Sequence, residues 1–254
     1  LTKKISQPKT KNLMQKTIST LVGMLAAVGA FHAHAAGLQV NPTSLSLPAK
    51  QRAGIFTLGN TGSEPLTAQV RVYGWSQDEK GNEVLTPTDA VIASPPMVKL
   101  EAGAKQQFRV IRIRPSEKPV EEAYRLIVDE LPAPQAKPRK GLQFVMRYSL
   151  PLFTNVQNNA EAKLNWRAEK NANGKTVLVA ENSGTAHAQL SNINLQTASA
   201  KEPLTLAGGL AGYVLPGNTW KRELDVSPAV FSQGRLNATV NGGATQPEVR
   251  FATP

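Results

Sequence analysis

The chain has 254 residues, a formal net charge of +11 at pH 7 and no cysteine. Its length allows one large domain or two of ordinary size, and a hydrophobic content of 41% is enough for packed cores. Without cysteine there is no disulfide, no thiolate nucleophile and no cysteine-ligated metal centre. Only three histidines occur, the carboxylates are scattered and no glycine-rich phosphate loop is found. We therefore expect no enzymatic activity, no metal site and no cofactor.

Residues 1–36 have the pattern of a signal peptide. Five lysines and no acidic residue precede and flank the apolar run 17–31, and small residues at positions 33–36 suit a signal peptidase. The alternative is a membrane anchor, but the run is shorter than the ~20 residues needed to cross the hydrocarbon core. We expect cleavage that leaves Ala36 or Gly37 first, and hence an exported protein.

Removal of this segment changes the charge balance. The five lysines leave with it, so that 24 of the 29 basic residues remain against 18 acidic ones, a net charge of +6. The remaining basic residues are scattered along the chain rather than clustered. We therefore expect no nucleic-acid partner.

The first half of the remaining chain reads as short strands separated by turn residues. Alternating or apolar stretches end at glycine, asparagine and proline, the pattern of a sandwich, and 78–82 has the composition of a hairpin turn. The strands expected here are 54–58, 68–75, 106–113, 123–131 and 142–153. Together with shorter ones they predict an immunoglobulin-like domain over residues 37–155.

The second half has the same character with a different spacing. The strands expected here are 162–168, 176–181, 187–195, 211–215, 220–226, 235–240 and 248–251. No stretch shows a sustained helical period, so no helix is expected. About 100 residues suffice for a second sandwich, which we place at 156–254. The fold class is therefore all-β, with two immunoglobulin-like sandwiches.

The stretch 142–153 is longer than the usual strand of about 5–6 residues. Every even position is apolar or aromatic, beginning with Leu142, Phe144 and Met146. One interpretation is a long strand whose even face packs into its own domain. The other is that its first half lies at an edge and offers these three side chains to another protein. The proline- and lysine-rich segment before it favours the second interpretation.

Several segments resemble the periplasmic pilus chaperones of chaperone–usher systems. They are 38–43, 94–103, 107–110, 129–132, Leu152–Phe153 and 215–218. The resemblance implies two immunoglobulin-like domains set at an angle with a cleft between them. It also implies capture of pilus subunits in the periplasm and their delivery to an outer-membrane usher. In that role Leu142, Phe144 and Met146, on the G strand, would fill the groove of a subunit that lacks its last strand.

The family anchors the subunit's terminal carboxylate with two basic residues, and this sequence departs from that pattern. The two positions read Ser44 and Pro151. Arg125, on the neighbouring strand, is the expected anchor, as in the archaic branch that includes Csu-type systems. Arg147 and Arg112 are second choices. A guanidinium binds a carboxylate in a bidentate geometry that lysine cannot reproduce.

The resemblance also implies that Arg109 and Glu121 form a pair that holds the two domains. The third member of that network reads Asn155, so Glu122 is an alternative partner. His187 is interpreted as a turn or edge residue rather than a ligand.

A second class of function stays open. Tandem sandwiches also build adhesion or carbohydrate-binding modules, in which Trp75, Trp166 and Trp220 would have to cluster as a sugar platform. Self-association of the free protein through its open strand is a further expectation.

Overall fold

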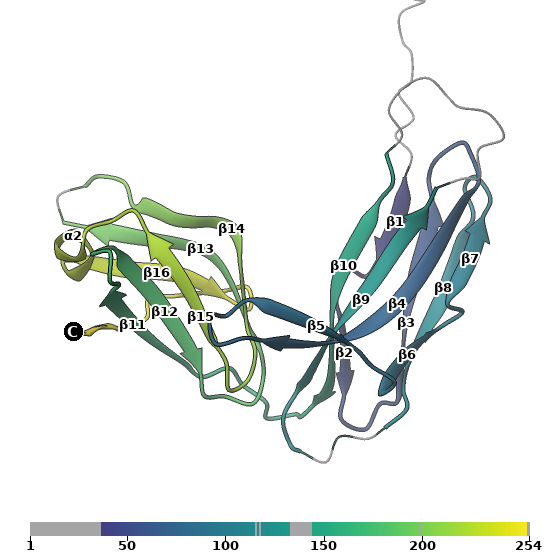
Figure 1. Cartoon of the computed structure of the whole chain (residues 1–254), viewed down its shortest axis with the longest axis horizontal. Helices are drawn as coiled ribbons and strands as arrows, with labels where there is room; N and C mark the ends of the chain where they lie inside the picture. Colours follow the sequence, from purple (N-terminus) through teal and green to yellow (C-terminus); the bar gives the residue numbers. More distant parts are fainter. Residues whose placement is uncertain (1–36, 115, 117, 133–143, 199, 253–254) are drawn as a thin grey trace, which may run out of the picture. The chain divides into compact units, whose positions relative to one another are not determined.

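The computed structural model describes residues 37–114, 116, 118–132, 144–198 and 200–252. These residues are nearly all strand and form two β-sandwiches of two sheets each (Figure 1). The expected all-β fold of two sandwiches is confirmed. The segment 1–36, expected to be a signal peptide, and Leu142 lie outside the described residues.

The first sandwich contains strands β1 to β10. One sheet has the order β1 (Leu38–Asn41), β3 (Ala53–Asn60), β8 (Lys105–Arg112) and β6 (Val91–Ser94). The other has the order β2 (Leu45–Pro48), β10 (Arg147–Val156), β9 (Glu122–Leu131), β4 (Leu66–Gln77) and β5 (Glu83–Pro87), with β7 (Met97–Leu100) also paired to β4. Between the sheets lie fully buried side chains such as Phe56 and Phe108, whose rings stack at 5.1 Å.

The second sandwich contains the remaining strands. One sheet has the order β15 (Thr219–Leu224), β12 (Thr176–Asn182), β11 (Leu164–Lys170) and β18 (Val249–Ala252). The other has the order β14 (Leu204–Val214), β13 (Ala188–Thr197), β16 (Gly234–Val240) and β17 (Gly243–Thr245). Trp166 and Trp220 meet edge to face in its core, with ring centroids 6.4 Å apart.

Some elements were not anticipated from the sequence. The strands β2, β5, β6 and β17 have only three to five residues each, too few to establish a period, and all five residues of β5 are exposed. The expectation of no helix was wrong at α2 (Pro228–Ser232). Ser227 caps this helix by accepting a hydrogen bond from the backbone of Val230, and Pro228 stands in its first turn. Five residues are too few to show a helical period.

The β4–β5 hairpin contacts the second sandwich. Its turn is built as predicted, with the Asp78 carboxylate accepting hydrogen bonds from the backbones of Lys80 and Asn82. The Gln77 amide donates to the carbonyl of Tyr213 and accepts from the backbone of Leu215, at 2.9 and 2.8 Å. These bonds tie the hairpin to β14 and the residue beyond it.

Gly81 at the hairpin tip permits this contact. Its φ is +83°, and a β-carbon there would lie 2.6 Å from the carbonyl oxygen of Thr219. We expect Gly81→Ala to lower the free energy of unfolding by roughly 2–4 kcal/mol, because it adds a backbone clash to an unfavourable φ. Gly103→Ala is the matched control: its φ is +73° but nothing lies within 4 Å. Equal shifts in the urea midpoint for both variants would contradict this account.

Candidate functional site

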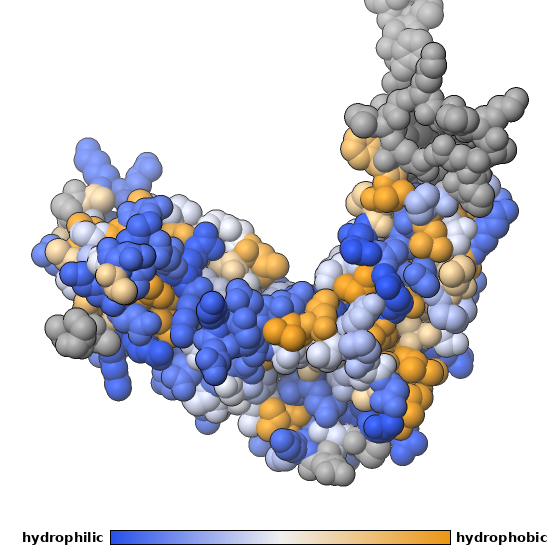
Figure 2. Space-filling model, viewed as in Figure 1, coloured by the Kyte–Doolittle hydropathy of each residue, from blue (hydrophilic) through white to orange (hydrophobic). Residues whose placement is uncertain are grey.

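The segment before β10 exposes large apolar side chains. Phe144 is 76% exposed, Val145 47% and Met146 40%. Met146 is held in place, since its carbonyl accepts the backbone N–H of Glu130 at 2.8 Å and its own N–H donates to the Glu130 carboxylate at 3.1 Å. Hydrophobic side chains are accordingly visible at the surface where β10 begins (Figure 2). A folded monomer normally buries such groups, so this segment is a candidate contact site.

The alternating pattern of 142–153 therefore spans two environments. Leu150 and Leu152 are buried in the first core and Tyr148 packs against it, whereas Phe144 and Met146 on the same face are exposed. The expected strand bounds need correction: β10 begins at Arg147 and runs on to Val156. The described residues 144–146 precede the strand, and none of them belongs to the hydrophobic core of the first sandwich.

The first half of β10 is also an open edge. On one side β10 pairs with β9 from Arg147 to Thr154. On the other side β2 pairs with it only at Leu152, Phe153 and Val156. Within the described part of the chain, no strand covers Arg147–Pro151 on that side. Unpaired backbone groups at such an edge are a template for another strand.

Arg125 lies on β9, directly opposite Pro151 of β10. Its Nε donates to the Glu83 carboxylate at 2.5 Å, and its guanidinium carbon lies 3.7 Å from the centroid of the Trp75 ring. The same carbon lies 5.4 Å from the centroid of the Tyr213 ring, which belongs to the second sandwich. The side chain is only 12% exposed. The expected anchor is thus a largely buried cation between aromatic rings, which strengthens its electrostatic interactions.

Arg147 and Arg71 share one carboxylate. Both guanidinium groups donate to Asp129, Arg71 at 2.5 Å. Burial by itself raises the pKa of Asp129, but the hydrogen bonds from Arg147 and then Arg71 outweigh it and hold that pKa below its usual 3.8. Arg147, the second candidate anchor, is therefore already engaged, next to a hollow of about 420 Å³ that Val145 and Met146 also line.

A depressed pKa makes Asp129 a source of acid sensitivity. Its contribution to folding is present above the unfolded pKa of about 4 and is lost as the pH falls through the lower folded value. We expect Asp129→Asn to have a smaller fall in urea midpoint between pH 7 and pH 3 than the parent protein. Asp89→Asn is the control, because that carboxylate is exposed and its ion pair with Arg114 is solvated. An unchanged pH profile in Asp129→Asn would refute the assignment.

Arg112, the third candidate anchor, has a structural position. It is 8% exposed, and its Nη2 donates to the carbonyl of Ala49 at 2.5 Å. Its Nη1 is buried with no partner among the described residues. A guanidinium enclosed in this way has no surface at which to meet a carboxylate, so the structure gives this residue a packing role instead.

Arg109 and Glu121, the expected pair, lie on different parts of the first sandwich. Arg109 is an exposed residue of β8 in the first sheet, whereas Glu121 precedes β9 in the other sheet, and no ion pair joins them among the described residues. Glu121 instead accepts the backbone N–H of His187 at 3.0 Å and lies 2.7 Å from its ring Nδ1. Asn155 donates to the carbonyls of Lys118 and Val120 and so braces the same segment.

His187 makes contacts with the first sandwich that the sequence did not indicate. Its ring stacks on Phe153 of the first sandwich at 3.5 Å and 5°. Phe153 in turn belongs to a small buried cluster with Trp75 and Leu215. A lone histidine between turn residues carries no spacing signal, so only the three-dimensional structure brings it to Glu121, 66 residues away.

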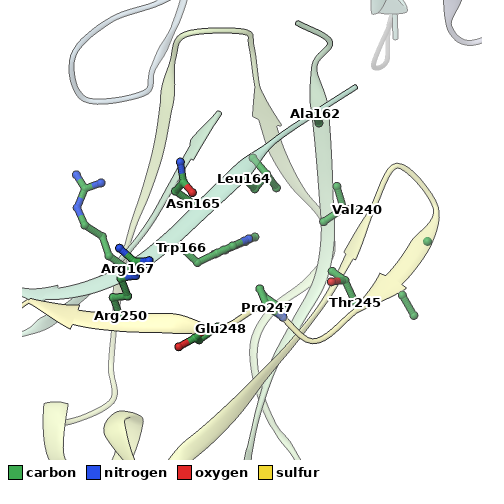
Figure 3. Close-up of a pocket in the computed structure, with 12 residues that line it drawn as sticks. Ala162, Leu164, Asn165, Trp166, Arg167, Val240, Thr245, Pro247, Glu248 and Arg250 are labelled. Atoms are coloured by element: carbon green, nitrogen blue, oxygen red, sulfur yellow. The ribbon is translucent and has the colours of Figure 1, made fainter. Parts of the chain in front are cut away.

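The second sandwich has a hollow of about 940 Å³ beside β11 (Figure 3). Trp166 lies behind it and is 5% exposed, while Arg167 at its rim is paired with Glu169 and Glu181. Trp75 and Trp220 are buried as well. None of the three tryptophans offers a flat, open face to a sugar.

Among the described residues no helix is long and apolar enough to cross a membrane.

The comparisons with known proteins agree on one family. Residues 37–157 match the family described as Pili and flagellar-assembly chaperone, PapD N-terminal domain. A chain of the CsuC–CsuE chaperone–tip adhesion subunit pre-assembly complex, from archaic chaperone–usher Csu pili of Acinetobacter baumannii, is 28% identical with a TM-score of 0.68. That alignment covers 86% of this chain and 100% of the other.

Two further structures share the fold at lower identity. The E. coli chaperone DraB is 16% identical, with a TM-score of 0.57 over 85% of this chain and 97% of its own. A chain from the complex of Salmonella enterica SafA pilin with the SafB chaperone is 16% identical, with a TM-score of 0.58 over 84% and 94%. No curated protein matches in sequence.

Proposed function

Because this chain belongs, through its N-terminal domain, to the pili and flagellar-assembly chaperone family, as its sequence predicted, we propose that it binds pilus subunits by strand donation and delivers them to an outer-membrane usher. The observation that carries the proposal is the exposed apolar segment Phe144–Met146 leading into the open edge of β10. Residues 1–36 are then the signal that directs export to the periplasm, and the role is non-enzymatic.

The open edge and the apolar segment act together in this mechanism. A subunit that lacks its last strand has an unfilled groove and unpaired backbone groups. β10 supplies backbone partners along Arg147–Pro151, and Leu142, Phe144 and Met146 supply apolar side chains for the groove. Each buried side chain contributes about 1.5–3 kcal/mol. The same surface, left uncovered, is where free copies would associate with each other.

The register of the sheet supports Arg125 as the carboxylate anchor. An added strand has to stop at Pro151, because β2 occupies the edge from Leu152 onward. Arg125 lies opposite Pro151, one strand away from that edge. Among the described residues, only its Nε donates a hydrogen bond. The two Nη groups can therefore donate to the terminal carboxylate of the subunit.

The alternative of a carbohydrate-binding module has less support. A sugar platform needs exposed aromatic rings, and the tryptophans are buried. The most exposed aromatic side chain among the described residues is instead Phe144, which is followed by the aliphatic side chains of Val145 and Met146. An apolar ridge of this kind matches an apolar groove better than a polar sugar.

Co-expression with pilus subunits from neighbouring genes tests the proposed function. We expect an equimolar complex and protection of the subunit from periplasmic proteases. The control is the same subunit with its groove filled by a fused donor strand of its own, which should not be captured. Absence of both complex and protection, with all neighbouring subunits tried, would overturn the proposal.

A further inference from the structure

We propose that Glu83 is an internal competitor for the carboxylate site at Arg125, so that its charge weakens the hold on a bound subunit. The inference rests on the proposed function, because it concerns the strength of the same anchor. Glu83 begins β5 and is 37% exposed, and its Oε2 lies 2.5 Å from the Arg125 Nε. A carboxylate therefore already occupies part of the guanidinium that a subunit carboxylate would need.

Arg125 does not need Glu83 for its orientation. Its guanidinium lies over the Trp75 ring at 3.7 Å, and Tyr213 is 5.4 Å away. Trp75 is itself buried in a cluster with Phe153 and Leu215, so this platform is rigid. Stacking of this kind fixes the plane of the guanidinium without an ion pair. The contact with Glu83 thus acts through its charge rather than by positioning.

The Glu83 side chain is also free to move away from Arg125. All residues of β5 are exposed, and among the strands that the structure describes it pairs only with β4. A glutamate side chain at such an edge can turn toward solvent at little cost, whereas Arg125 is held on its ring. When Glu83 stays in place, its carboxylate and that of the subunit share one guanidinium and repel each other. This repulsion weakens the binding of the subunit carboxylate. A chaperone has to release its client, and an anchor weakened in this way favours release.

Acetate binding to the 15N-labelled protein tests the inference without a subunit. The Nε–H resonance of Arg125 reports the occupancy of its guanidinium at pH 7 and constant ionic strength. We expect Glu83→Gln to bind acetate roughly tenfold more tightly than the parent, the scale of one like-charged neighbour at a partly exposed site. Glu79→Gln is the matched control, because Glu79 is an exposed residue of the same hairpin with no ion pair among the described residues.

Two outcomes would overturn the inference. One is an acetate response in Glu83→Gln that is equal to or weaker than that of the parent, including no response in either protein. The other is the same gain in Glu79→Gln, which would show a general effect of net charge.

The co-purified subunit provides a second readout. Its dissociation should be slower from Glu83→Gln than from the parent and Glu79→Gln, and Glu83→Gln should make no difference in an Arg125→Ala background. A failure of the proposed function appears as no captured subunit with any variant, while the acetate titration still decides the role of Glu83. Faster dissociation from Glu83→Gln would show that Glu83 supports the anchor, contrary to the inference.

Discussion

Replacing Phe144 and Met146 together by glutamate is expected to abolish subunit capture while the protein stays folded. Phe144 is 76% and Met146 40% exposed, and neither belongs to the first core, so their replacement should not change the free energy of unfolding by more than about 0.5 kcal/mol. In a subunit groove each apolar side chain is worth about 1.5–3 kcal/mol, and a charge in its place adds a desolvation cost. The affinity should fall by a factor of at least about 1,000.

Val145→Glu separates this account from a general effect of added charge. Val145 is exposed to a similar extent, and in an extended, donated strand its side chain would alternate with those of Phe144 and Met146. We expect it to retain capture within about tenfold, the effect of one peripheral side chain. The measurement is the yield of co-purified subunit, with dissociation rates for the variants that bind. Equal losses in Val145→Glu and the double variant would show that the face of the segment is irrelevant.

His187→Phe is expected to destabilise the protein by about 1.5–3 kcal/mol, although it keeps an aromatic ring on Phe153. The Glu121 side chain is 2% exposed and faces the ring Nδ1 at 2.7 Å. Phenylalanine cannot hydrogen-bond to the buried carboxylate, which among the described residues keeps only the backbone N–H of His187, and a hydrogen bond to a charged group typically contributes about 1.5–3 kcal/mol. Urea unfolding at pH 7 measures the change.

The double variant His187→Phe/Glu121→Leu provides the control. With both polar partners replaced by apolar groups, no buried carboxylate is left unpaired, and we expect much of the lost stability to return. If the free energy of unfolding of His187→Phe lies within about 0.5 kcal/mol of that of the parent, the contact between His187 and Glu121 does not stabilise the protein as described.

Several features could be predicted from local sequence because they depend on neighbouring residues. Alternation located most long strands, and the composition of 78–82 located the β4–β5 hairpin. The unusual length of 142–153 left open whether its first half packs in its own domain or lies at an edge, and Phe144 is exposed. The shortest strands and α2 were missed because three to five residues, or a single helical turn, are too few to show a period.

The sequence by itself determined the fold class, the alternating strands and the apolar segment before β10, because each is written in the spacing of adjacent side chains. Only the tertiary structure decided the partners of the charged residues. Arg125 meets Glu83 across 42 positions, and Glu121 meets His187 rather than Arg109 across 66. Strand register and the contact between sandwiches set such pairings. Neither is encoded in local periodicity, since many registers satisfy the same alternation.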